Sequence, residues 1–304
     1  MDWRAKALLQ GAFSLLPRGH DVNYLFQRHI THGLPLQEHK LDEMVELAGH
    51  HAAALAQRGR VPLGACRAYE FGAGWDLGMP LLLYCAGVNH QTIVDIRPLT
   101  RVDLVADLAR RLRSKDLPAA FVRRPEEPGG DDLDGYLARH GISYRAPLDR
   151  STGLPAGSVD GITSTNTLEH IPPADIAAIL RECRRLLAPG GVMSFQIDYQ
   201  DHYSYFDPSI SVYNFLRYDD RRWRLYNPSL HFQNRLRHRD YLDLIAGAGL
   251  AVAEAETDGG SADEIGVVAA LPPDDRFATY GGAELAVRRS RLVLVPRPEG
   301  ASSA

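Results

Sequence analysis

The sequence contains few cysteines and no long apolar run. Its three cysteines, Cys66, Cys85 and Cys183, are scattered among apolar neighbours over 304 residues, so neither a disulfide framework nor a zinc knuckle is expected. Thiols in such surroundings usually act as small buried apolar side chains, and they fit the reducing cytoplasm. No stretch reaches the roughly 18 apolar positions that a membrane-spanning helix requires. We therefore expect a cytoplasmic protein with no transmembrane segment.

A surplus of positive charge is also missing. Lysine and arginine total 34 against 38 aspartates and glutamates, which gives a formal net charge of −4. Proteins that hold RNA or DNA usually depend on clustered cations, so nucleic acid is not favoured as a partner. No low-complexity tract or internal repeat is present apart from the short tail 299–304, which we expect to be disordered. The apolar fraction of 45% is that of an ordinary globular protein.

Two regions of the chain differ in pattern. Residues 1–60 are predicted to form a helical segment, because apolar residues recur there every three or four positions. Over residues 61–298, short apolar strands alternate with amphipathic helices, with a polar loop expected at 123–135. Such alternation builds a mostly parallel sheet with helices on both faces, so we predict a doubly wound α/β domain. Residues 200–240 are dense in aromatic, Arg, Asp and His side chains, and they are predicted to be an insertion.

The start of the chain places Arg4 and Lys6 before an apolar stretch that Gln10 and Gly11 interrupt. No clean cleavage site follows, so we interpret it as an amphipathic helix and not as a signal peptide. Packing on the domain is the predicted use of its apolar side chains, and resting on a membrane surface is the alternative. The whole N-terminal segment is expected to form either a lid or a homodimer contact. The side chains expected to supply the apolar surface are Leu8, Leu9, Phe13, Leu15 and Leu16.

A glycine-rich loop follows the first predicted strand, in the stretch "AYEFGAGWDLG". Glycine lets backbone N–H groups approach a ligand, and Gly72 and Gly74 meet that need. A dinucleotide site would need G-x-G-x-x-G, but here the third glycine is misplaced and an acid, Glu70, precedes the first. A carboxylate at Glu70 suits a cationic amino group, and Asp95 at the end of the next strand can accept both hydroxyls of a ribose. A nucleotide-dependent oxidoreductase is the alternative.

Four motifs in this order resemble those of the class I S-adenosylmethionine-dependent methyltransferases, over roughly residues 64–250. They are "YEFGAG", "VDI", "YRAPLDRSTGLPAGSVDGITSTNTLEHI" and "LRECRRLLAPGGVMSFQID". The resemblance implies a Rossmann-like fold with a seven-stranded sheet and S-adenosylmethionine as cofactor. Asp76 stands where many members have a third glycine. The cofactor-binding residues that the resemblance implies are Glu70, Gly72, Gly74, Asp95 for the ribose, Asp149 for the adenine, and Asn166 and Thr167 at the methionine end.

Methyl transfer to a hydroxyl also requires that a proton be removed. His170, in "TLEHIPP", follows the fourth predicted strand, and a neutral imidazole suits the role of general base. Glu169 is its expected catalytic partner. The alternative is that this pair merely begins a helix, where a glutamate is favoured by the positive end of the dipole.

A second polar cluster leaves the fifth predicted strand in "IDYQDHYSYFD". Asp198, Asp201 and His202 would lie near Glu169 and His170 and could hold a divalent ion such as Mg²⁺, which would orient vicinal hydroxyls. A polar pocket wall without a metal is the alternative. The predicted acceptor-binding residues on this side are His202, Tyr203, Tyr205, Trp223 and His231.

Flat aromatic faces beside many hydrogen-bonding groups suit a sugar, another polyol or a phenol, although part of the aromatics is expected to form the core of the insertion. The Asn/Asp-Pro-Pro-aromatic tetrad typical of amide and ring-nitrogen methylation is missing, and "NTLE" stands in its place. We therefore predict an O-methyltransferase for a small-molecule or oligosaccharide acceptor. N- or C-methylation of a small metabolite and a non-catalytic cofactor-binding protein are the alternatives.

Overall fold

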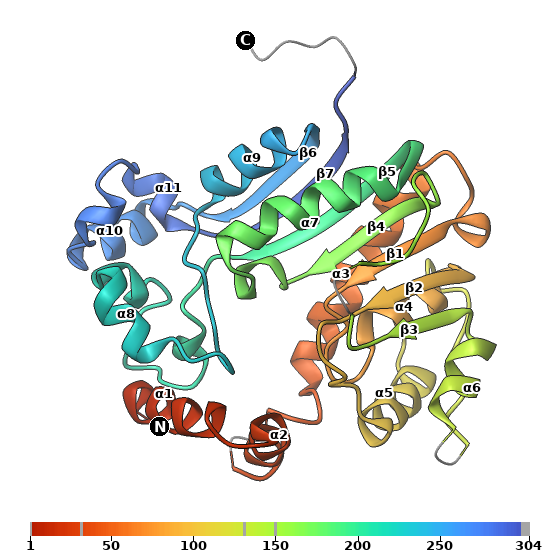
Figure 1. The fold of residues 1–304 in the computed structure, drawn as a ribbon, viewed down its shortest axis with the longest axis horizontal. Coiled ribbons are helices and arrows are strands. Elements are labelled where there is room, and N and C mark those ends of the chain that lie inside the picture. Colours follow the sequence, from red (N-terminus) through yellow and green to blue (C-terminus); the bar gives the residue numbers. More distant parts are fainter. Residues whose placement is uncertain (1, 31–32, 130–131, 149–150, 299–304) are drawn as a thin grey trace.

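A computed structural model describes residues 2–30, 33–129, 132–148 and 151–298 (Figure 1). Two sequence predictions concern residues outside these ranges, namely the adenine contact of Asp149 and the disordered tail 299–304. None of the described helices is long and apolar enough to cross a membrane.

A seven-stranded sheet forms the centre of the molecule (Figure 1). Its strand order is β3-β2-β1-β4-β5-β7-β6. The first five strands in that order are parallel, and β7 runs antiparallel to both of its neighbours. The predicted doubly wound, mostly parallel seven-stranded sheet is thus confirmed. The strands are β1 (Arg67–Phe71), β2 (His90–Val94), β3 (Ile142–Arg145), β4 (Val159–Thr165), β5 (Leu187–Asp198), β6 (Leu250–Gly259) and β7 (Val287–Pro296).

Helices cover both faces of the sheet, because successive strand residues point to opposite sides. Val192 packs into a core with α3, α4, α5 and α6, whereas its neighbour Met193 packs into a second core with α7 and α9. The three cysteines are free and buried, as the sequence predicts. The helices of these layers are α3 (Glu38–Arg58), α4 (Gly78–Ala86), α5 (Val102–Ser114), α6 (Leu133–Arg139), α7 (Pro173–Leu186) and α9 (His238–Gly247).

The chain reverses its direction across the sheet between β1 and β4. From β1 it winds outward to β2 and β3, then returns to β4 on the other side of β1. At such a switch point the loops after the two strands diverge and leave a crevice at their carboxyl ends, which is where open α/β sheets bind ligands. A ligand is therefore expected to bind near the residues that follow β1, β2, β4 and β5.

Short elements beside this edge form a third core around the aromatic insertion. They include one segment between β6 and β7 that the sequence analysis did not predict as helical. In Figure 1, α1 lies below α8, at the side of the molecule opposite the carboxyl end of the chain. The elements of this core are α1 (Trp3–Ser14), η3 (His202–Tyr205), η4 (Asn214–Arg217), α8 (Asp220–Tyr226), α10 (Ala262–Ala270), η5 (Asp275–Phe277) and α11 (Gly282–Ala286). The remaining described helices are α2 (Gly19–His29), η1 (Leu63–Ala65) and η2 (Leu168–His170).

The first helix packs through a different face from the one predicted. Its buried residues are Trp3, Lys6, Ala7 and Gln10, whereas Leu15 is 85% exposed. Trp3 decides the orientation, because its large ring fills a gap between the tyrosines of the insertion, with centroids 4.8 Å from Tyr226 and 5.5 Å from Tyr203. Spacings of three and four residues place Lys6, Ala7 and Gln10 on the same helix face as Trp3, which leaves the leucines outside.

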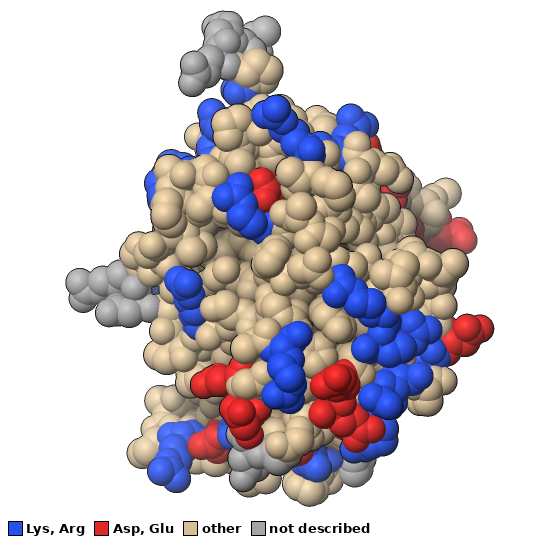
Figure 2. Space-filling view, turned by 90° about the vertical axis from the view of Figure 1, so that its right-hand side faces the viewer, with Lys and Arg blue, Asp and Glu red and all other residues tan. Residues whose placement is uncertain are grey.

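Both signs of charge are present on the face of the molecule that Figure 2 shows. Lys and Arg side chains are spread over this face, and Asp and Glu side chains lie among them, most of them in its lower half. Charges of opposite sign that lie close together weaken each other's field at a distance. The largest group of Lys and Arg side chains in this view lies at its lower right, and Asp and Glu side chains lie next to it.

Candidate active site

The turn after β1 needs glycine at two positions for different reasons. Gly72 and Gly74 have φ angles of +88° and +70°, a region that other residues rarely adopt. A Cβ atom on Gly72 would lie 2.3 Å from Oγ1 of Thr167, whereas a Cβ on Gly74 would meet no atom within 4 Å. Because Gly72 has no side chain, the segment that follows β4 can pack against the turn. Gly74 leaves the space above the turn open to a ligand.

Glu70 lies beneath this turn, at the end of β1. Its side chain is 3% exposed, and its Oε2 accepts a hydrogen bond of 3.0 Å from Oγ1 of Thr163. Burial raises the pKa of Glu70 to about 8, although the hydrogen bond from Thr163 acts in the opposite direction. The carboxyl is therefore mostly neutral at pH 7 until a cation approaches it.

Asp95 joins the tip of β2 to the same turn. Its Oδ1 accepts a hydrogen bond of 3.0 Å from the backbone N–H of Arg97. Burial raises the pKa of Asp95, and the N–H groups of Arg97, Ala73 and Gly74 oppose that rise. The carboxylate thus lies directly against the glycine turn, at the place where the sequence predicts a ribose contact.

The second helix covers the turn from outside. Tyr24 of α2 stacks on Trp75 of the turn with ring centroids 5.5 Å apart, and Arg101 pairs with Asp21 of the same helix. These contacts tie the N-terminal segment to the predicted cofactor loop.

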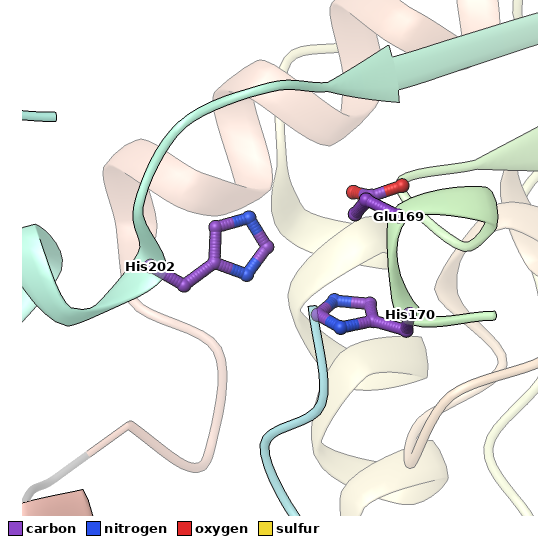
Figure 3. A group of neighbouring side chains, drawn as sticks. All are labelled: Glu169, His170 and His202. Carbon is purple, nitrogen blue, oxygen red and sulfur yellow. The ribbon is translucent and has the colours of Figure 1, made fainter. Parts of the chain in front are cut away.

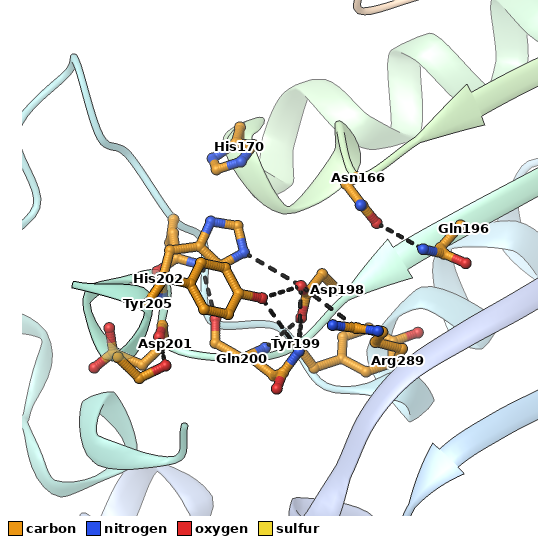
Figure 4. A network of polar contacts seen from close by, with 12 residues as sticks. Asn166, His170, Gln196, Asp198, Tyr199, Gln200, Asp201, His202, Tyr205 and Arg289 are labelled. Carbon is orange, nitrogen blue, oxygen red and sulfur yellow. Dashed lines mark hydrogen bonds and ion pairs between the residues drawn. The ribbon is translucent and has the colours of Figure 1, made fainter. Parts of the chain in front are cut away.

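The segment after β4 lies between the glycine turn and the residues after β5. Asn166 adopts a positive φ of 49°, and its Oδ1 accepts a hydrogen bond of 3.2 Å from Nε2 of Gln196 (Figure 4). Thr167 faces Gly72, as described above. Both residues thus lie at the carboxyl ends of β4 and β5, in agreement with the position that the resemblance implies.

His170 is held in one tautomer. Its Nδ1 lies 2.7 Å from the carbonyl oxygen of Phe232, and because a carbonyl can only accept, Nδ1 carries the hydrogen. Nε2 is then the atom with the free lone pair. His170 retains exposed surface, but the surrounding protein and the nearby His202 lower its pKa to about 4. The ring is therefore neutral at pH 7.

Glu169 lacks the partners that a buried carboxyl normally has. It is 3% exposed, and neither of its oxygens has a hydrogen-bond partner. Burial and the neighbouring Asp198 raise its pKa well above the ordinary value, although the backbone N–H groups of Glu169 and Asp198 act in the opposite direction. Figure 3 shows its carboxyl directed toward the rings of His170 and His202. The three side chains each place one potential metal-ligand atom within 4.8 Å of the others.

Asp198, at the end of β5, is the centre of a polar network (Figure 4). Its Oδ2 accepts a hydrogen bond of 2.5 Å from the hydroxyl of Tyr205 and lies 3.6 Å from Nε2 of His202. Gln200 donates its backbone N–H to Oδ1 at 2.9 Å. Burial alone would raise the pKa of Asp198, but His202, Tyr205 and Gln200 lower it well below its usual range. This carboxylate is therefore charged and already bonded.

A cavity of 890 Å³ opens beside this network, between α3 and the ends of β4, β5, β6 and β7. Its cations face carboxylates, as Arg291 does with Glu256 at 2.8 Å. No local signal in the sequence indicates the contributions of α3 and β7, because these elements lie far from the motifs along the chain. The principal polar lining residues are Lys40, Glu43, Glu46, Asn166, Gln196, Asp198, His202, Tyr205, Glu256, Asp258, Arg289 and Arg291.

Not all of the predicted acceptor residues reach the cavity. His202 and Tyr205 line it, but Tyr203 and Trp223 are 0% and 3% exposed and belong to the core of the insertion. These two predictions were wrong because the large rings are buried against Trp3 and Phe215. His231 lies behind this edge, with its centroid 6.4 Å from that of His202, and its Nε2 has no hydrogen-bond partner.

Asp201 is engaged elsewhere. It is fully buried and accepts hydrogen bonds of 2.9 Å from both the backbone N–H of Tyr203 and the side chain of Asn214. Of the three residues predicted to hold a metal, the structure therefore brings His202 and Asp198 to the imidazole cluster but not the carboxylate of Asp201.

Comparison with protein families adds to this geometry. The family described as "Methyltransferase domain" matches residues 133–195, from α6 into β5, a range that includes Glu169 and His170 but not the glycine turn. The order of the sheet and its antiparallel β7 are those of the Rossmann-like methyltransferase fold. Together these observations support a class I S-adenosylmethionine-dependent methyltransferase. No curated protein matches the chain.

The solved structures that are similar to this chain have low sequence identity to it. A putative methyltransferase of Haloferax volcanii, solved with the activator Trm112, is 18% identical with a TM-score of 0.44, over 86% of this chain and 95% of that chain. The YcgJ protein of Bacillus subtilis is 16% identical with a TM-score of 0.46, over 83% and 100%. The [4+2]-cyclase SpnF is 15% identical with a TM-score of 0.48, over 86% and 84%.

S-adenosylmethionine is the cofactor that the family implies, and the described residues fit it. The turn is open at Gly74, a carboxylate lies at the tip of β2, and a second carboxyl lies beneath the turn. The carboxylate of Asp95 would repel a pyrophosphate but suits ribose hydroxyls, and the buried carboxyl of Glu70 becomes charged when an ammonium group approaches it.

Proposed function

We propose that the methyltransferase transfers a methyl group to a hydroxyl of a small polar acceptor, and that the acceptor is a sugar or a glycan unit. One observation carries this proposal. A neutral imidazole with a free Nε2, that of His170, lies beside His202 with ring centroids 5.0 Å apart, and His202 lines a polar cavity that Asn166 also lines. A neutral hydroxyl is a weak nucleophile and must lose its proton during the attack, whereas a neutral amine attacks through its free lone pair.

Different residues of the chain bind the cofactor, remove the proton and position the acceptor in the proposed reaction. The bound cofactor supplies an electrophilic methyl group on a sulfonium. Gly72 and Gly74 shape the turn that receives the methionine part, and Asp95 accepts the ribose hydroxyls. His170 takes the hydroxyl proton on Nε2, while the carbonyl of Phe232 keeps Nδ1–H oriented. The residues that line the cavity position the acceptor oxygen in line with the methyl group.

The cavity wall supports a sugar as acceptor. Tyr205 stacks on His202 with centroids 5.1 Å apart, and 47% of its surface is exposed. An exposed flat ring can cover the apolar face of a sugar, while amide and charged groups such as those of Asn166, Gln196 and Arg289 bind its hydroxyls. Because the lining contains Lys and Arg side chains as well as carboxylates, a neutral polyol fits better than an acceptor with one strong charge.

The test begins with isothermal titration of the purified chain with S-adenosylmethionine, with NADH in a parallel titration. A turnover screen over sugars, phenols and organic acids follows, with and without EDTA, and NMR of the product locates the methyl group. Methylation of a sugar oxygen is the expected result. A methyl group on nitrogen or carbon would replace the O-methyl assignment, binding without any turnover would favour a non-catalytic protein, and binding of NADH alone would overturn the cofactor.

Asp95→Ala and His170→Ala are matched variants for the same assays. Asp95→Ala is expected to lose cofactor affinity, and His170→Ala is expected to keep it and lose turnover. Normal turnover by His170→Ala would remove His170 from the mechanism.

A further inference from the structure

Glu169, His170 and His202 come together because two neighbouring strands end side by side. Glu169 and His170 lie in η2, just after β4, and His202 begins η3, just after β5. Since β4 and β5 are parallel neighbours, their carboxyl ends meet at the same edge of the sheet. The potential ligand atoms of the three residues all lie within 4.8 Å of one another (Figure 3).

Each of the three groups is in a state suited to metal binding. Both oxygens of Glu169 are buried and unpaired. His170 donates Nδ1–H to a backbone carbonyl, which leaves Nε2 bare, and metal-bound histidines commonly have such a partner. Nε2 of His202 has no hydrogen bond, and Oδ2 of Asp198 lies 3.6 Å from it. Because Asp198 is already bonded to Tyr205 and Gln200, it suits the outer shell of such a site.

Among the described residues, Glu169 is distinctive in having two buried side-chain atoms without a partner. Leaving one buried polar atom unpaired costs about 1–3 kcal/mol, and a charged one costs more. A ligand that supplies positive charge or hydrogen-bond donors would therefore stabilise the cluster. A divalent cation would do so for the carboxylate and for both imidazoles at once.

We infer that Glu169, His170 and His202 bind a first-row divalent transition-metal ion. Two imidazoles with one carboxylate favour an ion such as Zn²⁺ or Co²⁺, whereas Mg²⁺ prefers oxygen ligands throughout. The site thus differs from the Mg²⁺ site predicted from Asp198, Asp201 and His202, both in its ligands and in its metal. Three protein ligands leave coordination positions free, and the adjoining cavity would allow an acceptor oxygen to take one of them.

The coordination of an acceptor oxygen by the metal rests on the proposed function, and the metal would change how that function is carried out. Nε2 of His170 has one lone pair, so it acts as a general base in the metal-free protein and as a ligand in the metal-bound protein. In the metal-bound form the ion would lower the pKa of a coordinated hydroxyl, and the proton would pass to solvent water instead of His170.

Metal binding can be measured without a methyl donor or acceptor. The EDTA-treated and dialysed full-length chain is titrated calorimetrically with Zn²⁺, and its bound metal is counted by elemental analysis after gel filtration. Co²⁺ in a parallel sample reports its ligand set by visible absorption. The expected result is one equivalent of metal per chain and, for Co²⁺, bands typical of mixed nitrogen and oxygen ligands.

The variants are Glu169→Gln and His202→Ala, with His39→Ala as the control because His39 is exposed on α3. Removal of a ligand is expected to weaken binding by more than the roughly 10–100-fold that outer-shell changes cost, and the control is expected to bind as the unaltered chain does. Circular dichroism and S-adenosylmethionine titration verify that each variant is folded. Absence of stoichiometric binding, or equal binding by folded Glu169→Gln and His202→Ala, would overturn the metal site and leave the proposed methyl transfer untouched.

Discussion

The buried carboxyl of Glu70 predicts a specific dependence of stability on pH. Its pKa rises from the ordinary 4.5 to about 8 on folding, because burial disfavours the charged form. The folded state therefore holds a proton that the unfolded state has released between these two pH values. Stability contributed by this group is complete below about pH 4.5 and is lost as the pH rises through about 8. Glu70→Gln removes this titration and keeps the shape of the side chain.

The magnitude follows from the interval between the two pKa values. At about 1.36 kcal/mol per pH unit, the interval between 4.5 and about 8 corresponds to roughly 5 kcal/mol, which is an upper bound. The amide introduced by Glu70→Gln can still accept the hydrogen bond from Thr163, so the variant is expected to match the unaltered chain at pH 5 to within about 1 kcal/mol. At pH 8.5 the variant is expected to be more stable by several kcal/mol.

Urea unfolding at pH 5 and at pH 8.5, followed by circular dichroism without S-adenosylmethionine, measures both differences. Glu127→Gln is a matched control, because Glu127 is exposed and the charge change is the same. An equal loss of stability with rising pH in the unaltered chain and in Glu70→Gln would refute the reasoning. So would a Glu70→Gln variant that is less stable at pH 8.5.

Three further predictions concern the cofactor turn and the base. Gly72→Ala is expected to destabilise the fold by about 3 kcal/mol, because the added methyl group clashes with Thr167, whereas Gly74→Ala meets open space and should cost only about 1–2 kcal/mol, as urea unfolding would show. Asp95→Asn should weaken S-adenosylmethionine binding at least about tenfold in calorimetry, since an amide cannot accept two ribose hydroxyls equally well, and unchanged affinity would exclude the ribose contact. His170→Ala, assayed as EDTA-treated protein, should reduce kcat about 10²–10⁴-fold with cofactor affinity intact.

The sheet and the glycine turn were predictable because their signals are local. A strand that ends in glycines, with an acid at the end of the next strand, places Gly72, Gly74 and Asp95 at one edge by topology alone. The helix α6 was missed, since it has only seven residues and lies in a stretch rich in Pro, Gly and Asp, a composition typical of a loop. Its start is fixed by a contact that periodicity does not reveal, the cap in which Asp132 accepts from the N–H of Gly135.

The walls of the cavity were less predictable because they depend on long-range packing. Arg289 and Arg291 reach the site only because β7 inserts between β5 and β6, and Lys40 reaches it because α3 crosses the sheet beside β5. The sequence also could not separate aromatic residues of the core from those of the cavity. Tyr203 and Tyr205 are two positions apart, yet one is buried against Trp3 and the other is exposed on His202.

The way in which this chain treats its buried polar groups distinguishes structural from functional residues. Arg237 is fully buried and donates to the carbonyls of Tyr199, Leu285 and Val287, although its Nε has no partner, and Asp201 accepts hydrogen bonds from within the insertion. A fold that supplies three acceptors to one buried arginine is able to supply a donor to a buried glutamate. Nevertheless, neither side-chain oxygen of Glu169 has a hydrogen bond of normal geometry. Because its carboxyl faces two imidazoles beside the cavity, the missing partner is best explained as one that comes from outside the chain and binds there.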